Sequence, residues 1–202
     1  MKDQELVSIL EEKIAEDQDR IELDLSNKPI IQFSEISKAL FELKFQNLEM
    51  LFLENCDLKS LQNFPVLPIL SILNLSDNVF PGKELTALKH LEFLTVLKLN
   101  ICKNVSISDI FELAIFPNLR KLDIKHMSFQ VGSQQRSQIF QRCASLRVLN
   151  DFDENEQVIY ESSSESFESE DEFNSCNMVF QKSQWENEME FDDNFKIERI
   201  KK

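Results

Sequence analysis

A leucine-rich pattern that recurs along most of the chain predicts an α/β leucine-rich-repeat solenoid, a curved parallel sheet of about five repeats. The clearest copy covers residues 48–64, in the order L-x-x-L-x-L-x-x-C-x-L-x-x-L. Its middle leucine recurs at Leu51, Leu73, Leu97 and Leu122, in steps of 22, 24 and 25 residues, and repeats of this class measure about 20 to 29 residues. Since one unit cannot bury its own apolar face, the units are expected to stack.

Residues 1–20 are expected to form an N-terminal capping helix. Apolar residues recur there at helical spacing, with charged residues on the other face: Leu6, Ile9, Leu10 and Ile14. The first unit of a repeat array exposes the apolar end of its core. We therefore expect this helix to cover that end.

Residues 21–135 are expected to hold the repeats. The first repeat starts with a strand at 23–25, and apolar residues then follow at roughly helical intervals: Ile30, Phe33, Ile36, Leu40 and Phe41. Each strand is expected to return through a convex segment, so that parallel strands line a concave face. The ninth repeat position normally holds a buried Asn that bonds neighbouring turns. Only Asn78 keeps it, and the other repeats carry Cys56, Cys102 and Met127.

Residues 136–155 are expected to form a C-terminal cap, and residues 156–202 an acidic tail. The cap pattern is a helical run followed by an apolar strand, built on Ile139, Phe140, Cys143, Leu146 and Leu149. Residues 151–202 hold 16 acidic and five basic residues, whereas residues 1–150 hold 20 and 17. Because the tail has too few aliphatic residues to offset the entropy of ordering, it is expected to be disordered.

The outward positions of the predicted strands form the first candidate partner-binding surface. Side chains alternate between the two faces of a strand, so these residues should point away from the core: Asp24, Met50, Phe52, Glu54, Ile72, Asn74, Ser76, Val96, Lys98, Asn100, Lys121, Asp123 and Lys125. Met50, Phe52, Ile72 and Val96 predict an exposed apolar strip, which often marks a partner site; Glu54 and Lys98 complete the candidate site. The alternative is that these side chains pack on one another or under the tail.

The tail is the second candidate surface. Aromatic and acidic residues interleave in it, and the aromatic candidates for partner binding are Phe167, Phe173, Trp185 and Phe191. Such a chain can be steered to a basic surface by charge and then anchor its rings in pockets; a generic solubilising tail is the alternative. Ser162 and Ser169 each have a glutamate three residues on, which makes them candidates for phosphorylation by an acid-directed kinase.

The sequence shows no catalytic, cofactor or metal motif. His90 and His126 lack a partnered nucleophile motif, and the cysteines are too widely spaced for a zinc site: Cys56, Cys102, Cys143 and Cys176. A formal net charge of −14 disfavours nucleic acid and membrane surfaces and favours basic protein partners. The amino terminus lacks the apolar segment of a secretory signal. We expect a monomeric, non-enzymatic, intracellular binding protein without a cofactor.

Two segments and the acidic tail carry a resemblance to a known family. LSILNLSDN at residues 70–78 and FQRCASLRVLNDFDEN at residues 140–155 resemble the acidic leucine-rich nuclear phosphoprotein family. The second segment matches the family ending L-x-x-L-D-G-Y-D at Leu146, Leu149, Phe152 and Asp153. Asn150 and Asp151 stand where the family has Asp-Gly.

The resemblance implies a non-enzymatic protein of nucleus and cytoplasm that binds histones, inhibits a phosphatase or acts as an adaptor. The leading prediction is an acidic nuclear histone-binding or chaperone-like protein whose partners are core histones. One alternative is a regulator that binds the catalytic subunit of a serine/threonine phosphatase. The other is a structural scaffold subunit of a spliceosomal or ciliary complex.

Overall fold

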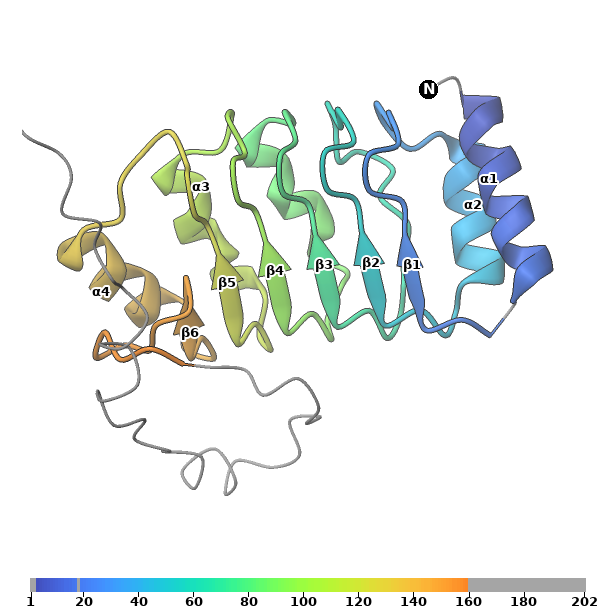
Figure 1. Ribbon diagram of the computed structural model, residues 1–202. Coiled ribbons are helices and arrows are strands. Elements are labelled where there is room, and N and C mark those ends of the chain that lie inside the picture. Colours follow the sequence, from blue (N-terminus) through green and yellow to red (C-terminus); the bar gives the residue numbers. More distant parts are fainter. Residues whose placement is uncertain (1–2, 18, 160–202) are drawn as a thin grey trace, which may run out of the picture. The chain divides into compact units, whose positions relative to one another are not determined.

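The computed structural model describes residues 3–17 and 19–159. In this part of the chain, six short strands form one parallel sheet in the order of the sequence, from β1 to β6 (Figure 1). In chain order the elements are α1 (Asp3–Glu16), β1 (Glu22–Asp24), α2 (Glu35–Lys44), β2 (Met50–Phe52), β3 (Ile72–Asn74), η1 (Gly82–Leu88), β4 (Val96–Lys98), α3 (Ile107–Phe111), η2 (Glu112–Ile115), β5 (Lys121–Asp123), α4 (Ser133–Arg142) and β6 (Val148–Leu149). The predicted leucine-rich-repeat solenoid is confirmed.

The middle leucine of each repeat sets the register of the sheet. Six leucines pair from strand to strand, and each is 0% exposed: Leu23, Leu51, Leu73, Leu97, Leu122 and Leu149. Burial of one leucine side chain stabilises a fold by about 1.5 to 3 kcal/mol, so this row holds neighbouring repeats together. The last of these leucines lies in the cap that follows the five predicted repeats.

Helix α1 covers the N-terminal end of the core. Leu6 and Leu10 are 2% and 0% exposed and belong to the same buried cluster as Leu23. The helix contacts α2 and lies beyond β1 at that end of the array (Figure 1). Charged residues on its other face, such as Glu11 and Glu12, are exposed.

The sequence predicts Ile36 to lie on the apolar face of the first return segment, and this prediction is wrong. This residue is 64% exposed, while Ser37 is fully buried. The Ser37 N–H donates to Ser34 Oγ at 3.0 Å, and the Ser34 N–H donates to Ser37 Oγ at 2.9 Å. Because this reciprocal N-cap holds Ser37 against the body of the protein, Ile36 is rotated by about 100° around the helix and faces solvent.

The C-terminal cap is closed around Arg136 of α4. Its guanidinium donates to the carbonyl oxygens of Leu149, at 3.3 Å, and of Asp153. It also lies 5.2 Å from the ring centre of Phe140 and 5.9 Å from that of Phe152. Cation–π contacts of this kind contribute about 0.5 to 2 kcal/mol. Arg136 therefore joins the helix of the cap to the chain that follows β6.

Candidate protein-binding face

The concave face is the face of the sheet whose side chains alternate with the buried leucines. Strand register brings Met50, Ile72 and Val96 side by side on β2, β3 and β4. Phe52 lies in the next outward row of β2, opposite Asn74 of β3. Met50, Phe52, Ile72 and Val96 are all partly exposed. They form what we call the apolar strip, which crosses three neighbouring strands.

Three outward positions are buried, although strand alternation predicts them to be exposed. Asn74, Ser76 and Asp123 are 7%, 3% and 5% exposed. The Asn74 side chain is held on both sides, because its Nδ2 donates to Glu54 at 2.9 Å and its Oδ1 accepts the Ser76 N–H at 3.0 Å. Alternation gives the face on which a side chain lies. It does not predict which short side chains their longer neighbours will cover.

Two atoms on this face have unused hydrogen-bonding capacity. Ser76 Oγ and Asp123 Oδ1 are buried and have no hydrogen-bond partner within the described part of the chain. Burial raises the pKa of Asp123, and the nearby ammonium group of Lys121 opposes that rise. A buried acceptor without a donor costs about 1 to 3 kcal/mol. Neither atom was singled out by the sequence, because no motif marks a side chain that its neighbours leave unpaired.

Lysines gather on the concave face where β4 and β5 lie. Lys98 of β4 pairs in register with Asp123 of β5. Lys121 lies 3.7 Å from a carboxylate oxygen of Asp151, and Lys125 donates a hydrogen bond to the other oxygen. This bond from Lys125 lowers the pKa of Asp151. Lys121 and Lys125 are therefore held in place by a carboxylate of the cap.

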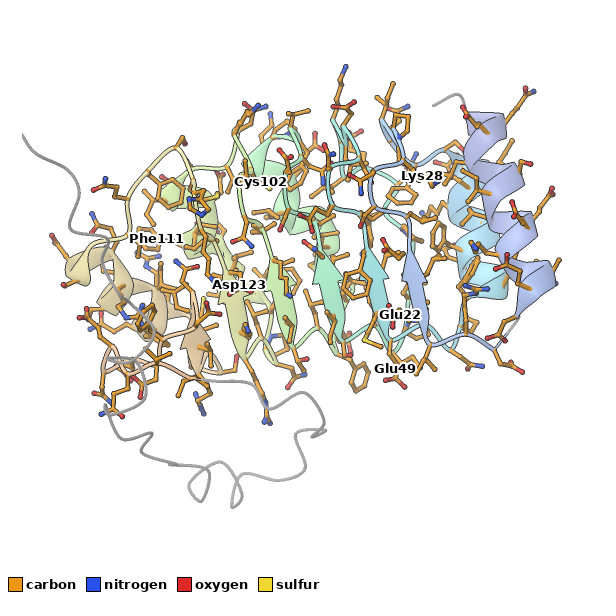
Figure 2. The ribbon with its side chains drawn as sticks, in the orientation of Figure 1. Glu22, Lys28, Glu49, Cys102, Phe111 and Asp123 are labelled. Carbon is orange, nitrogen blue, oxygen red and sulfur yellow. The ribbon has the colours of Figure 1, made fainter. Side chains whose placement is uncertain are left out.

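The opposite end of the sheet is acidic. Glu22 and Asp24 of β1, Glu49 just before β2 and Glu54 just after it are all exposed. Figure 2 shows Glu22 and Glu49 at this end of the array, with Asp123 several strands away on β5. The apolar strip therefore lies between side chains of opposite charge.

The histidines and the repeat cysteines considered for catalysis or metal binding lie in different repeats of the array. His90 Nε2 lies 3.0 Å from the carbonyl oxygen of Pro65, and His126 is exposed in the turn after β5. Burial raises the pKa of the Cys56 and Cys102 thiols to about 11, so neither forms a thiolate nucleophile at neutral pH. No group of three or more His, Cys, Asp or Glu residues that could hold a metal ion occurs among the described residues.

No helix in residues 3–17 and 19–159 is long and apolar enough to cross a membrane. The candidates in the tail fall outside these residues: Phe167, Phe173, Trp185, Phe191, Ser162 and Ser169.

The register, the core and the exposed sheet face define a leucine-rich-repeat protein. The resemblance to the acidic leucine-rich nuclear phosphoproteins is confirmed by curated relatives. The chain is 30% identical over 129 residues to acidic leucine-rich nuclear phosphoprotein 32-related protein 1 of Caenorhabditis elegans, across 62% of this chain and 56% of that protein. It is 26% identical over 131 residues to acidic leucine-rich nuclear phosphoprotein 32-related protein of Plasmodium falciparum, across 64% and 46%. The chain thus spans about half the length of these two relatives.

A third relative is a histone of Tetrahymena thermophila, 30% identical over 112 residues, across 55% of this chain and 29% of that protein. Among solved structures, the Drosophila melanogaster SNF/U2A' complex contains a chain similar in fold, with a TM-score of 0.52 and 22% identity, over 69% of this chain and 75% of that one. No family model matches the chain.

Proposed function

We propose that this chain is a non-enzymatic protein-binding adaptor whose concave face holds its partner. The observation that carries the proposal is the apolar strip. In a repeat array the core lies behind the sheet, so the strip contributes nothing to the main core and leaves apolar area in contact with water. Exposed apolar area of this kind in the middle of a solenoid face commonly marks a partner site.

We propose basic nuclear proteins, with core histones first, as the partners. The formal net charge of −14 attracts cationic proteins. The names of the two phosphoprotein relatives support a nuclear location. In this proposal the tail aromatics Phe167, Phe173, Trp185 and Phe191 add a second, charge-steered contact, and phosphates on Ser162 and Ser169 would strengthen the negative field.

The test is binding of purified core histones to the full-length protein, measured by fluorescence anisotropy at several salt concentrations. Phe52→Asp is expected to weaken binding about tenfold or more, because it places a carboxylate in an apolar contact. Binding should also fall as salt rises, because the attraction between net charges is screened. Phe93→Asp is the matched control, since Phe93 is 58% exposed and lies outside the strip. If Phe52→Asp and Phe93→Asp weakened histone binding equally, the concave face would not be the binding surface.

Removal of residues 160–202 tests the contribution of the tail. If histone binding is lost with the tail and is unaffected by Phe52→Asp, the tail alone is the binding element. A purified phosphatase catalytic subunit in the same assay tests the second candidate. Binding of that subunit in place of histones, with sensitivity to Phe52→Asp, would favour the phosphatase-regulating function.

A further inference from the structure

Charges on the concave face are separated by sign along the array. The acidic end, over β1 and β2, is made of Glu22, Asp24 and Glu54, which occupy outward positions. The basic end, over β4 and β5, is made of Lys98, Lys121 and Lys125. Figure 2 shows Glu22 on β1 and Asp123 on β5, with the other strands between them. The apolar strip crosses β2, β3 and β4 and so joins the two ends.

The carboxylates near the basic end do not cancel its charge. Asp151 contacts Lys121 and Lys125 and neutralises part of their charge. Asp123 is 5% exposed, so little of its carboxylate faces an approaching partner. The three lysines also outnumber these two carboxylates. A partner that approaches the concave face therefore meets negative charge at one end and positive charge at the other.

We propose that the concave face binds a protein segment that is cationic at one end, apolar in the middle and acidic at the other. Its cationic end lies over β1 and β2, its apolar part contacts the apolar strip, and its acidic end lies over β4 and β5. This inference rests on the proposed function and adds to it the charge order of the partner and its direction across the strands. A partner that is basic throughout would bring like charges to Lys98 and Lys125, which is unfavourable.

The spacing of the strands sets the size of such a segment. Neighbouring strands lie about 4.8 Å apart, so the four steps from β1 to β5 measure about 19 Å. A helix rises about 1.5 Å per residue and spans this distance in about 13 residues. Helical peptides are therefore suitable probes, because they hold two charged ends at a fixed separation.

The experiment uses the full-length protein and three fluorescent helical peptides with a shared Leu/Ala middle of about 13 residues. The first has lysines at one end and glutamates at the other, the second has lysines at both ends, and the third has glutamates at both. Glu22→Lys/Asp24→Lys is expected to weaken binding of the lysine/glutamate peptide about tenfold and to strengthen binding of the all-glutamate peptide. Lys98→Glu should also weaken the lysine/glutamate peptide and should strengthen the all-lysine peptide.

Glu11→Lys/Glu12→Lys is the matched control, because it changes the net charge by the same amount on the exposed face of α1. This control should change binding of each peptide by less than about twofold, since α1 lies at the end of the array. Equal effects of the two double variants would overturn the inference, because net charge would then explain the binding. Failure of all three peptides to bind would also overturn it. If Phe52→Asp still weakened histone binding in either case, the proposed function would stand without the charge order.

Discussion

At the residue scale, Asn78 joins neighbouring turns of the array through one buried amide. Its Oδ1 accepts the N–H groups of Cys56 and Leu58, at 3.2 and 2.9 Å. Its Nδ2 donates to the carbonyl oxygens of Leu53 and Leu75, at 2.7 and 2.9 Å. The amide therefore satisfies backbone groups of two repeats that would otherwise be buried without partners.

Cysteines occupy the same position in the repeats on either side and make fewer bonds. Cys56 Sγ donates to the carbonyl oxygen of Leu25 at 3.2 Å, and Cys102 Sγ donates to that of Leu75 at 3.3 Å. A thiol is a weak donor. Each cysteine therefore satisfies a carbonyl of the preceding repeat but offers no equivalent of the amide oxygen.

Asn78→Ala is expected to lower the free energy of unfolding by about 3 kcal/mol, because it leaves several buried backbone groups unpaired. Cys102→Ala, the matched control at the equivalent position, should cost about 1 to 2 kcal/mol, for one weak bond and a small cavity. Urea unfolding followed by circular dichroism measures both. Equal losses of unfolding free energy would show that the Asn78 amide contributes no more to stability than the Cys102 thiol does.

Asp123 and Asp151 are expected to affect stability with opposite signs. Burial raises the pKa of Asp123 in the folded state, so its ionisation is a penalty that is present above that raised pKa and disappears as the pH falls to about 4. The bond from Lys125 lowers the pKa of Asp151, so its stabilisation is present above about pH 4 and is lost as the pH falls through the lowered value.

Asp123→Asn should therefore raise the melting temperature at pH 7, and Asp151→Asn should lower it slightly, by the equivalent of less than about 1 kcal/mol. The gain from Asp123→Asn should disappear near pH 4, and the loss from Asp151→Asn should shrink below that pH. Calorimetry at pH 7, 4 and 3 measures both changes. Shifts of the same sign at pH 7 would contradict this account of Asp123.

At the scale of single elements, η1 and α3 pack closely at Gly82. A Cβ built on Gly82 would lie 2.9 Å from the Cβ of Asp109 and closer still to its carboxylate. Asp109 cannot move away freely, because its Oδ2 accepts the N–H and the hydroxyl of Ser106, at 2.8 and 2.5 Å, at the N-cap of α3. The space for a side chain at residue 82 is therefore already occupied.

Gly82→Ala is expected to lower the free energy of unfolding by about 1 to 3 kcal/mol, as overpacking does. Gly132→Ala is the control, because its Cβ would meet only the Oε1 of Gln135, at 3.1 Å, at the end of a flexible, partly exposed side chain. Its cost should be below about 1 kcal/mol, the effect of Ala in place of Gly at the N-cap of α4. Thermal unfolding compares the two variants. Equal losses of stability would mean that Asp109 can move away from an alanine at position 82 at little cost.

The sequence predicts the strands of the sheet better than it predicts the segments that return from one strand to the next. The strands follow from Leu51, Leu73 and Leu97, because a fixed spacing of leucines sets both strand position and register. The sequence does not predict the helical turns η1, α3 and η2, because a return segment needs only a few apolar contacts and can adopt several backbone conformations. The apolar strip could be located from alternation. The burial of Asp123 could not, because it depends on side chains of neighbouring strands.

At the scale of the whole described unit, the buried side chains form one cluster from Leu6 to Leu149. Each repeat is stabilised mainly by its neighbours, so a defect at one end should act first on the repeats beside it. Helix α1 is the best place to test this property. Leu10 is fully buried at the end of the cluster, and Ser8 lies exposed on the same helix.

Leu10→Asp is expected to lower the free energy of unfolding by about 3 kcal/mol or more, because it places a carboxylate against the core of the first repeat. Amide hydrogen exchange should speed up most at β1, less at β2 and least at β5, since the cost passes from one repeat to the next through their interfaces. Ser8→Asp adds the same charge on the exposed face and should leave exchange unchanged. Uniform acceleration from β1 to β5 would instead show that the whole array opens as one cooperative unit.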